Sequence, residues 1–202
     1  MLTSIGDVMR RAYDKGWITT RDGNISLKWL DSSSMYITPS GVRKTIIHPE
    51  AIIKTDISSE WFADVVCPPG VTPSGELEMH WMIQKCNKPT LAVVHLHPTN
   101  IIAAVYAGWD LQELAEEFPE VSRYSKVGKT VPVLPVISTE LAMCTFDHMT
   151  KDKKICYDIV AQAGHGVCAV GSSPWGAYEH IERLDHICEI VLKSGRKPNA
   201  DC

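Results

Sequence analysis

The protein has 202 residues, a length that suits one domain with a substantial core. Its 45% hydrophobic and 22% charged composition is that of an ordinary globular protein. A formal net charge of −4 gives no electrostatic reason to expect nucleic-acid or anionic-membrane binding, and no apolar run approaches the roughly 20 residues that cross a bilayer. We therefore predict a single domain over residues 1–202, with neither nucleic acid nor a membrane as its partner.

The cysteine pattern indicates a reducing compartment. Seven cysteines are scattered along the chain without a CxxC pair, so neither a disulfide framework nor a thiolate metal site is expected. The first residues lack the apolar core and small-residue cleavage site of a signal peptide. These features predict a cytoplasmic protein.

In chain order, the first expected element is a helix over residues 3–15, because Ile5, Val8, Met9 and Ala12 have helical spacing. The rest of the first half is expected to contain strands at 24–29, 35–38 and 51–57, a proline-rich loop at 65–75 and a helix at 74–85. In the second half we expect a buried strand at 91–97, helices at 100–107 and 111–117, an irregular edge strand at 131–137, and helices at 139–150 and 173–194 around the strand GVCAVG. Strands cluster early and alternate with helices later, which predicts a three-layer mixed α/β domain.

The stretch LAVVHLHP (91–98) places two histidines one residue apart at the end of an apolar run. Because side chains alternate along a strand, His95 and His97 project from one face and can converge on a single ion. The pattern alone fits packing or hydrogen-bonding histidines as well as it fits ligands. A divalent-metal site needs a third protein donor.

The best candidate for that donor is His165 in AGHGVCAVG (163–171), where the flanking glycines allow a tight turn and a close backbone approach. A turn histidine with a hydrogen-bonding role is the alternative. Three neutral imidazoles would hold Zn²⁺, or a related divalent ion such as Mn²⁺ or Co²⁺, and leave a position open for substrate oxygens. The histidines on expected helices, His80, His180 and His186, are assigned packing or surface roles.

A carboxylate lies in TPSGELEMH (72–80). Glu76 is expected in the first turn of the helix that starts near Ser74, pointing about 200° away from Glu78 around the helix axis. Both can simply favour the positive helix terminus, and for Glu78 we adopt that interpretation. Glu76 can instead act as a general base beside a metal.

Two further glycine-containing segments, DGNIS (22–26) and TPSG (38–41), can combine with Ser74 and Gly75 into an anion cradle. They offer hydroxyls, a carboxamide and accessible backbone N–H groups, which bind phosphate without a large positive charge. Each segment alone is a common turn sequence. Arg43 and Lys44 follow the second segment and can add charge.

The ordered motifs GNIS, YITPSG, PSGE, VVHLH, STELA and GHGV resemble the class II aldolase/adducin-head family, from about residue 10 to residue 192. The resemblance implies an α/β/α fold around a mainly antiparallel sheet and a homotetramer with active sites between subunits. It matches His95, His97 and His165 to zinc ligands and Glu76 to the catalytic acid/base. It also matches a set of residues to the phosphate pocket, namely Asn24, Ser40, Gly41, Ser74 and Gly75.

The sequence departs from the family pattern in several places. Ser74-Gly75 replaces the two serines that often precede the catalytic Glu in the aldolases, so one phosphate hydroxyl is missing. Glu rather than Asp at position 76 favours C–C cleavage or decarboxylation over epimerisation. The segment 118–129 aligns poorly, which leaves Tyr124 a weak match to the family's proton-donating tyrosine.

These observations lead to one hypothesis and its alternatives. The hypothesis is a metal-dependent aldolase that cleaves a small phosphorylated ketose through a metal-stabilised enediolate, with Glu76 moving the proton. The alternatives are an epimerase, decarboxylase or dehydratase of the same family and, further away, a non-catalytic interaction domain like an adducin head.

Overall fold

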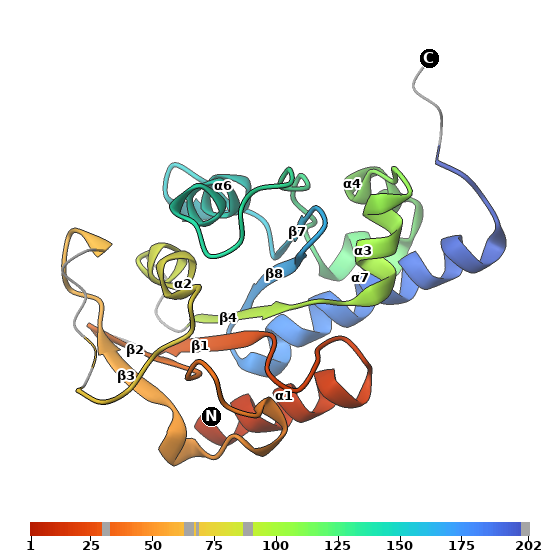
Figure 1. Cartoon of the computed structure of the whole chain (residues 1–202). Helices are drawn as coiled ribbons and strands as arrows, with labels where there is room; N and C mark the ends of the chain where they lie inside the picture. Colours follow the sequence, from red (N-terminus) through yellow and green to blue (C-terminus); the bar gives the residue numbers. More distant parts are fainter. Residues whose placement is uncertain (30–32, 63–66, 68, 87–90, 199–202) are drawn as a thin grey trace.

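A six-stranded antiparallel sheet in the order β3-β2-β1-β4-β8-β7 forms the centre of the domain (Figure 1). The computed structural model describes residues 1–29, 33–62, 67, 69–86 and 91–198. The strands of the sheet are β1 (Asn24–Lys28), β2 (Ser34–Ile37), β3 (Ile53–Asp56), β4 (Leu91–Leu96), β7 (Ile159–Gln162) and β8 (Gly166–Gly171). A separate hairpin pairs β5 (Thr150–Lys151) with β6 (Lys154–Ile155).

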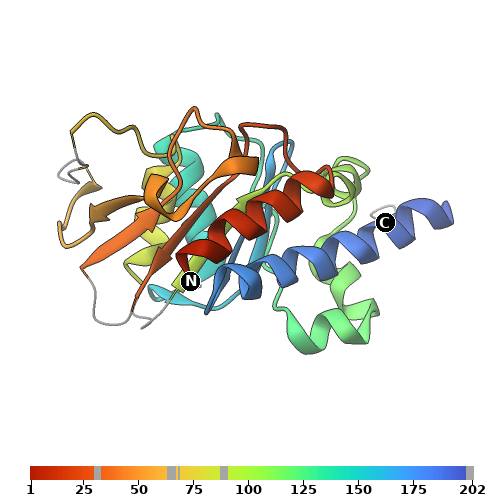
Figure 2. The same ribbon diagram turned by 90° about the horizontal axis from the view of Figure 1, so that it is seen from below.

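Helices cover both faces of this sheet, which confirms the predicted α/β/α architecture. Figure 2 shows α1 (Leu2–Asp14) and α7 (Pro174–Ser194) running side by side across one face. On the opposite face lie α2 (Leu77–Gln84) and α6 (Thr139–Met149). The shorter helices α3 (Thr99–Tyr106), α4 (Leu111–Glu117) and α5 (Pro119–Tyr124) pack against α7. Single 3-10 turns occur at η1 (Lys44–Ile46) and η2 (Pro49–Ala51).

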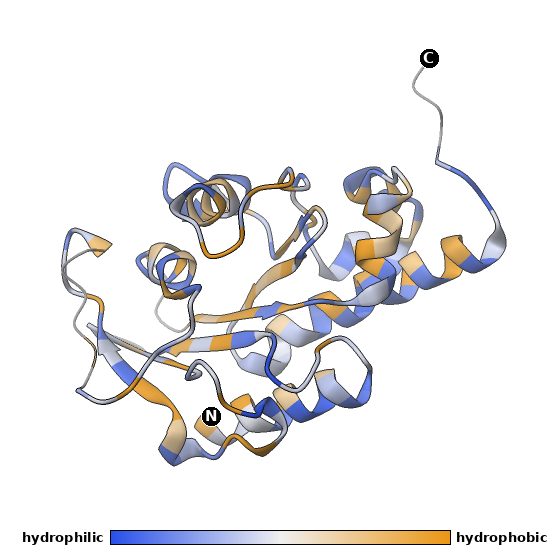
Figure 3. Ribbon diagram, viewed as in Figure 1, coloured by the Kyte–Doolittle hydropathy of each residue, from blue (hydrophilic) through white to orange (hydrophobic). Residues whose placement is uncertain are grey.

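The period-two alternation of the strands divides the core between the two faces. On β4, Ala92, Val94 and Leu96 belong to the cluster beneath α1 and α7, while Leu91 and Val93 belong to the cluster beneath α2 and α6. Most residues of β4 and β8 are hydrophobic (Figure 3), as expected for strands covered on two sides. His95 therefore faces α2 rather than α7.

Sequence signals at the termini of α7 explain its 21-residue length. The Ser173 hydroxyl accepts a hydrogen bond from the N–H of Gly176, Pro174 occupies the first turn, and Gly195 ends the helix at a φ of +73°. No helix in the described part of the chain is long and apolar enough to span a membrane.

Three expectations about local structure were wrong. Residues 131–137 do not form an edge strand: within that segment only Val131 makes a bridge, to Gln162, because Pro132 and Pro135 have no N–H to donate. The helix expected at 74–85 starts at Leu77, so Glu76 is its N-cap residue rather than part of its first turn. The expected strand at 51–57 contracts to Ile53–Asp56, since Pro49 begins a 3-10 turn before it.

Candidate metal centre

The end of β4 is the element around which the site is built. In the antiparallel ladders, His95 lies opposite Asn24 of β1 and opposite Cys168 of β8. The backbone N–H of His97 donates to the carbonyl of Trp17 at 3.1 Å, which fixes the chain immediately after the strand. His95 consequently projects from a backbone that is paired on each side, and His97 from a backbone held by its bond to Trp17.

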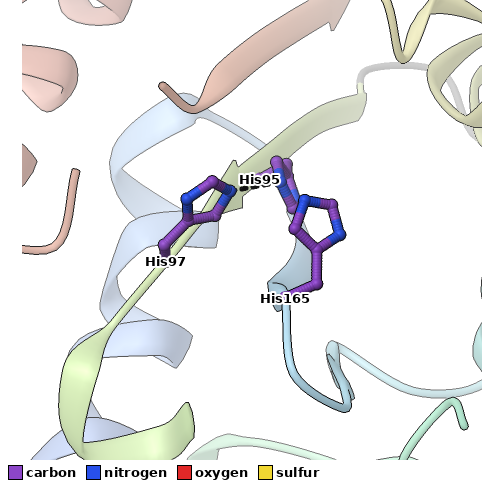
Figure 4. Close-up of side chains that lie close together, drawn as sticks. All are labelled: His95, His97 and His165. Carbon is purple, nitrogen blue, oxygen red and sulfur yellow. Dashed lines mark hydrogen bonds between the residues drawn. The ribbon is translucent and has the colours of Figure 1, made fainter. Parts of the chain in front are cut away.

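His165 reaches the same point from the turn that precedes β8, and the three imidazoles face one another (Figure 4). Their ring centroids are 4.8–5.0 Å apart, and one ligand nitrogen from each lies within 4.8 Å of the other two. Gly166 is required for this approach: a Cβ there would meet the carbonyl oxygen of Leu96 at 2.5 Å and the ring of His97 at 2.7 Å. The glycines around His165 therefore allow the close backbone approach that the sequence suggested.

Hydrogen bonding selects the tautomer of His95. Its Nδ1 is 3.0 Å from the carbonyl oxygen of Val167, which can only accept, so the ring proton is on Nδ1 and the lone pair is on Nε2. Burial lowers the pKa of His95 well below its usual range, and the neighbouring His97 and His165 lower it further. Burial and His165 lower the pKa of His97 as well. His95 is therefore neutral at physiological pH, with its unprotonated nitrogen directed at the other side chains.

The donor set fits a divalent cation. Nε2 of His95 is hydrogen-bonded to Nε2 of His97 at 2.9 Å and lies 3.2 Å from Oε2 of Glu76, so atoms able to bind a metal converge on one point. Nδ1 of His165 and Oε1 of Glu76 are buried and have no hydrogen-bond partner. A positive ion would give these atoms a partner, and imidazole nitrogens are ligands that Zn²⁺ prefers.

Glu76 points into the same space from the N-terminus of α2. Its Oε2 accepts a hydrogen bond from Nδ2 of Asn24 at 2.7 Å, and its Oε1 is 3.9 Å from Nε2 of His165. Glu78 turns away, as expected, and accepts a hydrogen bond from the hydroxyl of Thr139. Of the two carboxylates of this segment, only Glu76 adjoins the histidines.

A cavity of about 240 Å³ opens beside these groups. Every site residue predicted from the sequence lines it except Tyr124: Asn24, Ser40, Gly41, Ser74, Gly75, Glu76, His95, His97 and His165. Arg21 and Lys44 add positive charge to the wall, whereas Arg43 is not among its lining residues. Burial lowers the pKa of Lys44 to about 8, partly opposed by the charge of Asp22, and its ammonium group donates to the carbonyl of Pro39 at 2.6 Å.

Tyr124 lies elsewhere, at the end of α5. Its ring is half-exposed and stacks near the guanidinium groups of Arg123 and Arg183, and it does not line the cavity within one chain. Sequence reasoning also missed two residues near the site. Arg21 precedes the DGN turn without any distinguishing pattern, and His80 is fully buried and bonded to Asn24, although we expected it only to pack.

Comparison with known proteins identifies a family and several similar chains. The family model described as "Class II Aldolase and Adducin N-terminal domain" matches residues 3–192. A methylthioribulose-1-phosphate dehydratase of Danio rerio is 32% identical over 97% of this chain and 86% of its own length. An L-fuculose phosphate aldolase of Methanococcus vannielii is 28% identical over 88% of each chain. The crystal structure of L-fuculose-1-phosphate aldolase from Thermus thermophilus superposes with a TM-score of 0.74 at 21% identity, covering 96% of this chain and 95% of that one.

Proposed function

The chain belongs to the class II aldolase and adducin family, and from that premise we propose that it is a metal-dependent aldolase that reversibly cleaves a small phosphorylated ketose. The observation that carries this proposal is the place of Glu76, whose carboxylate adjoins His95 and His165 at the floor of the cavity. An acid/base group beside a cluster of imidazoles suits proton transfer on a sugar substrate whose oxygens a metal ion would hold.

His95, His97 and His165 would hold the ion, which we propose to be Zn²⁺ or a related divalent ion such as Mn²⁺ or Co²⁺. When bound, the ion supplies Lewis-acid stabilisation of the negative charge that develops on the substrate's oxygen atoms. The hydrogen bond from His95 to Val167 keeps the ligand nitrogen of that ring unprotonated.

Glu76 would carry the proton. One of its oxygens, Oε2, is already engaged by Asn24, while Oε1 is buried without a partner. We assign Oε1 as the atom that takes the hydroxyl proton when the C–C bond breaks and places it on the freed carbon of the ketone fragment. In the reverse reaction both transfers run backwards. Because the carboxylate is held at one oxygen, the other keeps a fixed position relative to the reacting carbon.

The polar end of the cavity would bind the phosphate. Ser40, Gly41, Ser74 and Gly75 provide small side chains and backbone there, and Lys44 and Arg21 provide charge. The positive φ of Gly41, +71°, gives this turn a conformation in which backbone groups are able to approach an anion closely. The two cations compensate for the hydroxyl lost where Gly75 replaces a second serine.

Dehydration of a related sugar phosphate is the second candidate, favoured by one specific feature. A recess of about 150 Å³ adjoins the cavity and shares Gly75, Glu76 and Ile137 with it. Its remaining wall consists of four apolar residues, Phe62, Met79, Leu141 and Ala142, together with Glu78 and Ser138. Such a recess suits a substrate with an apolar tail, like the methylthio sugar in the name of the Danio rerio relative.

Product analysis by NMR tests these assignments. Metal-reconstituted protein is incubated with L-fuculose 1-phosphate, methylthioribulose 1-phosphate and related ketose and pentulose phosphates. An aldehyde with a three-carbon ketone phosphate indicates cleavage, whereas loss of water, epimerisation or CO₂ release identifies the other family reactions. Protein that binds no divalent ion and transforms no substrate would instead favour a non-catalytic interaction domain.

Glu76→Gln tests the proposed mechanism, with Glu116→Gln, at an exposed position on α4, as its control. We expect Glu76→Gln to lower turnover by about 10²–10⁴-fold, the usual contribution of a general acid/base, without changing metal content. Glu116→Gln should keep turnover near that of the wild type. Full turnover by Glu76→Gln would contradict the mechanism.

We further propose that the protein acts in the cytoplasm as a homotetramer in which Tyr124 serves the site of a neighbouring copy. Five of the described cysteines are outside disulfides, which suits a reducing compartment: Cys67, Cys144, Cys156, Cys168 and Cys188. Tyr124 is half-exposed and separate from the cavity of its own chain, so a proton-donating role requires a site built between two copies.

A further inference from the structure

A line of buried polar side chains runs behind Glu76, between β1 and α2. Nε2 of Gln84 is 2.9 Å from the hydroxyl of Ser26, and that hydroxyl is 2.7 Å from Nδ1 of His80. Nε2 of His80 is hydrogen-bonded to Oδ1 of Asn24, whose Nδ2 reaches Glu76. Ser26, His80 and Gln84 are completely buried, so these hydrogen bonds do not compete with bulk water.

The residue spacing explains why these groups form a continuous line. Asn24 and Ser26 are two apart on β1, so both face α2. His80 follows Glu76 by four residues, which places it one turn further along α2 and above the same face of the sheet. Gln84 is one turn further still, and its amide also donates to the carbonyl of Leu91 at 3.0 Å.

The hydrogen bonds have only one consistent direction. Nδ2 of Asn24 donates to Oε2 of Glu76, so the amide presents its carbonyl oxygen to His80. His80 must then donate from Nε2, which leaves Nδ1 to accept from the hydroxyl of Ser26. Burial lowers the pKa of His80 to about 3, so the ring is neutral and carries this one proton. The Ser26 oxygen completes the line by accepting from Gln84.

We propose that His80 is a positioning residue which, as the Nε2–H tautomer, fixes the amide of Asn24 and thereby directs one N–H at Oε2 of Glu76. This inference rests on the proposed role of Glu76 as proton carrier. If the amide flipped, the carbonyl oxygen of Asn24 would face the carboxylate and repel it. The N–H of His80 prevents the flip because it would then meet the NH₂ group of Asn24 instead of an acceptor.

Removal of this ring should act on Glu76 and not on the metal ligands. His80→Phe keeps an aromatic ring but leaves Oδ1 of Asn24 without its donor and the hydroxyl proton of Ser26 without its acceptor. His80→Gln keeps an N–H that can donate to Asn24 and a carbonyl oxygen that can accept from the hydroxyl of Ser26. We expect kcat to fall about 10–100-fold in His80→Phe at unchanged zinc content, with KM changing far less, and His80→Gln to recover most of the loss.

The first measurement needs no substrate. Zinc-loaded protein labelled with ¹⁵N-histidine is examined by long-range ¹H–¹⁵N NMR, and the His80 signals are identified by their absence in His80→Gln. We expect the Nε2–H tautomer at neutral pH in the wild type, and a mixture of tautomers in Ser26→Ala, which lacks the hydroxyl donor to Nδ1. A wild-type His80 protonated at Nδ1, or at both nitrogens, would overturn the proposal even if His80→Phe fails to fold.

The kinetic comparison uses whichever phosphorylated ketose the wild type converts. Equal loss of kcat in His80→Gln and His80→Phe would overturn the positioning role, since only one of them lacks the donor. The two proposals can fail separately. Full turnover by Glu76→Gln would contradict the proposed role of Glu76 in the reaction. An inactive Glu76→Gln together with the Nδ1–H tautomer of His80 would contradict only the positioning role of His80.

Discussion

Asn24 lies directly opposite His95 in the antiparallel pairing of β1 with β4. Because paired residues project from the same face of a sheet, this register brings the amide that holds Glu76 to the side of the histidine ligand cluster. A shift of one residue would turn Asn24 toward α1 and α7 and separate it from Glu76. The sheet register thus joins the acid/base group to the candidate metal centre.

Gly166→Ala should disrupt that centre without altering any ligand. The new Cβ would lie 2.5 Å from the carbonyl oxygen of Leu96 and 2.7 Å from the ring of His97, so the turn carrying His165 must move away from β4. We expect a weakening of zinc affinity of at least tenfold and a loss of about 2 kcal/mol or more in unfolding free energy. Competition with a chromophoric chelator and urea denaturation measure the two effects.

Gly176→Ala is the matched control. Gly176 lies in the first turn of α7, where the nearest contact of an added Cβ would be the hydroxyl of Ser173, at 3.4 Å. This substitution should leave zinc affinity unchanged and stability equal or slightly higher, because alanine favours helix by about 1 kcal/mol over glycine. Wild-type zinc affinity in Gly166→Ala would contradict the requirement for glycine at position 166 in bringing His165 to the other two histidines.

Asp185 connects α7 to the start of α3, just beyond His97. Its buried carboxylate accepts hydrogen bonds from the backbone N–H groups of Asn100 and Ile101 and from the indole of Trp17. Asp185→Ala leaves these buried donors without an acceptor, so we expect a loss of about 2–4 kcal/mol in urea denaturation. Asp147→Ala, on the exposed side of α6, should change stability by no more than about 0.5 kcal/mol. A comparably small effect at Asp185 would contradict this account.

Strand periodicity was sufficient to predict much of this site. The shared face of His95 and His97 follows from alternation alone, and the glycines around His165 correctly indicated a close backbone approach. Bringing His165 to the other two required the pairing of β4 with β8, about 70 residues apart in sequence. That pairing is a tertiary contact, which in the sequence was visible only through the family resemblance.

His80 and Glu76 illustrate what local patterns miss. The expectation that His80 packs in the core was compatible with its burial, but its partners Asn24 and Ser26 lie on a strand more than 50 residues earlier. Glu76 was expected inside the helix because Pro73 and Ser74 look like starting residues, yet the helix begins at Leu77. Helix boundaries depend on capping geometry, which single residues specify only loosely.

Lys44 should make phosphate binding depend on pH. Burial lowers the pKa of Lys44 to about 8, so the ammonium group loses its charge as the pH rises through that value. We expect the affinity of zinc-loaded protein for inorganic phosphate, measured by calorimetry, to fall by up to about tenfold between pH 8 and 9. Lys44→Met should bind phosphate more weakly with a flatter pH profile, and an identical slope in both proteins would contradict the assignment.

The same shift affects stability. The pKa of Lys44 in the folded protein lies below the value of 10.5 for an ordinary lysine, so the unfolded chain binds more protons between these values. The contribution of Lys44 to the free energy of unfolding therefore increases with pH from about 8 to 10.5. Urea denaturation across this window should show a smaller increase for Lys44→Met than for the wild type.

Tyr124 and Glu76 should complement each other across a subunit interface. If each site takes Glu76 from one copy and Tyr124 from the next, Glu76→Gln and Tyr124→Phe tetramers are each impaired. Random co-assembly of equal amounts then gives both native residues to about one site in four, because each residue is intact with a probability of one half. Turnover of the mixed tetramers, minus that of the separately assembled variants, should thus approach a quarter of the wild-type rate. A site built within one chain gives no such gain, and full activity of Tyr124→Phe alone would exclude the tyrosine from the reaction.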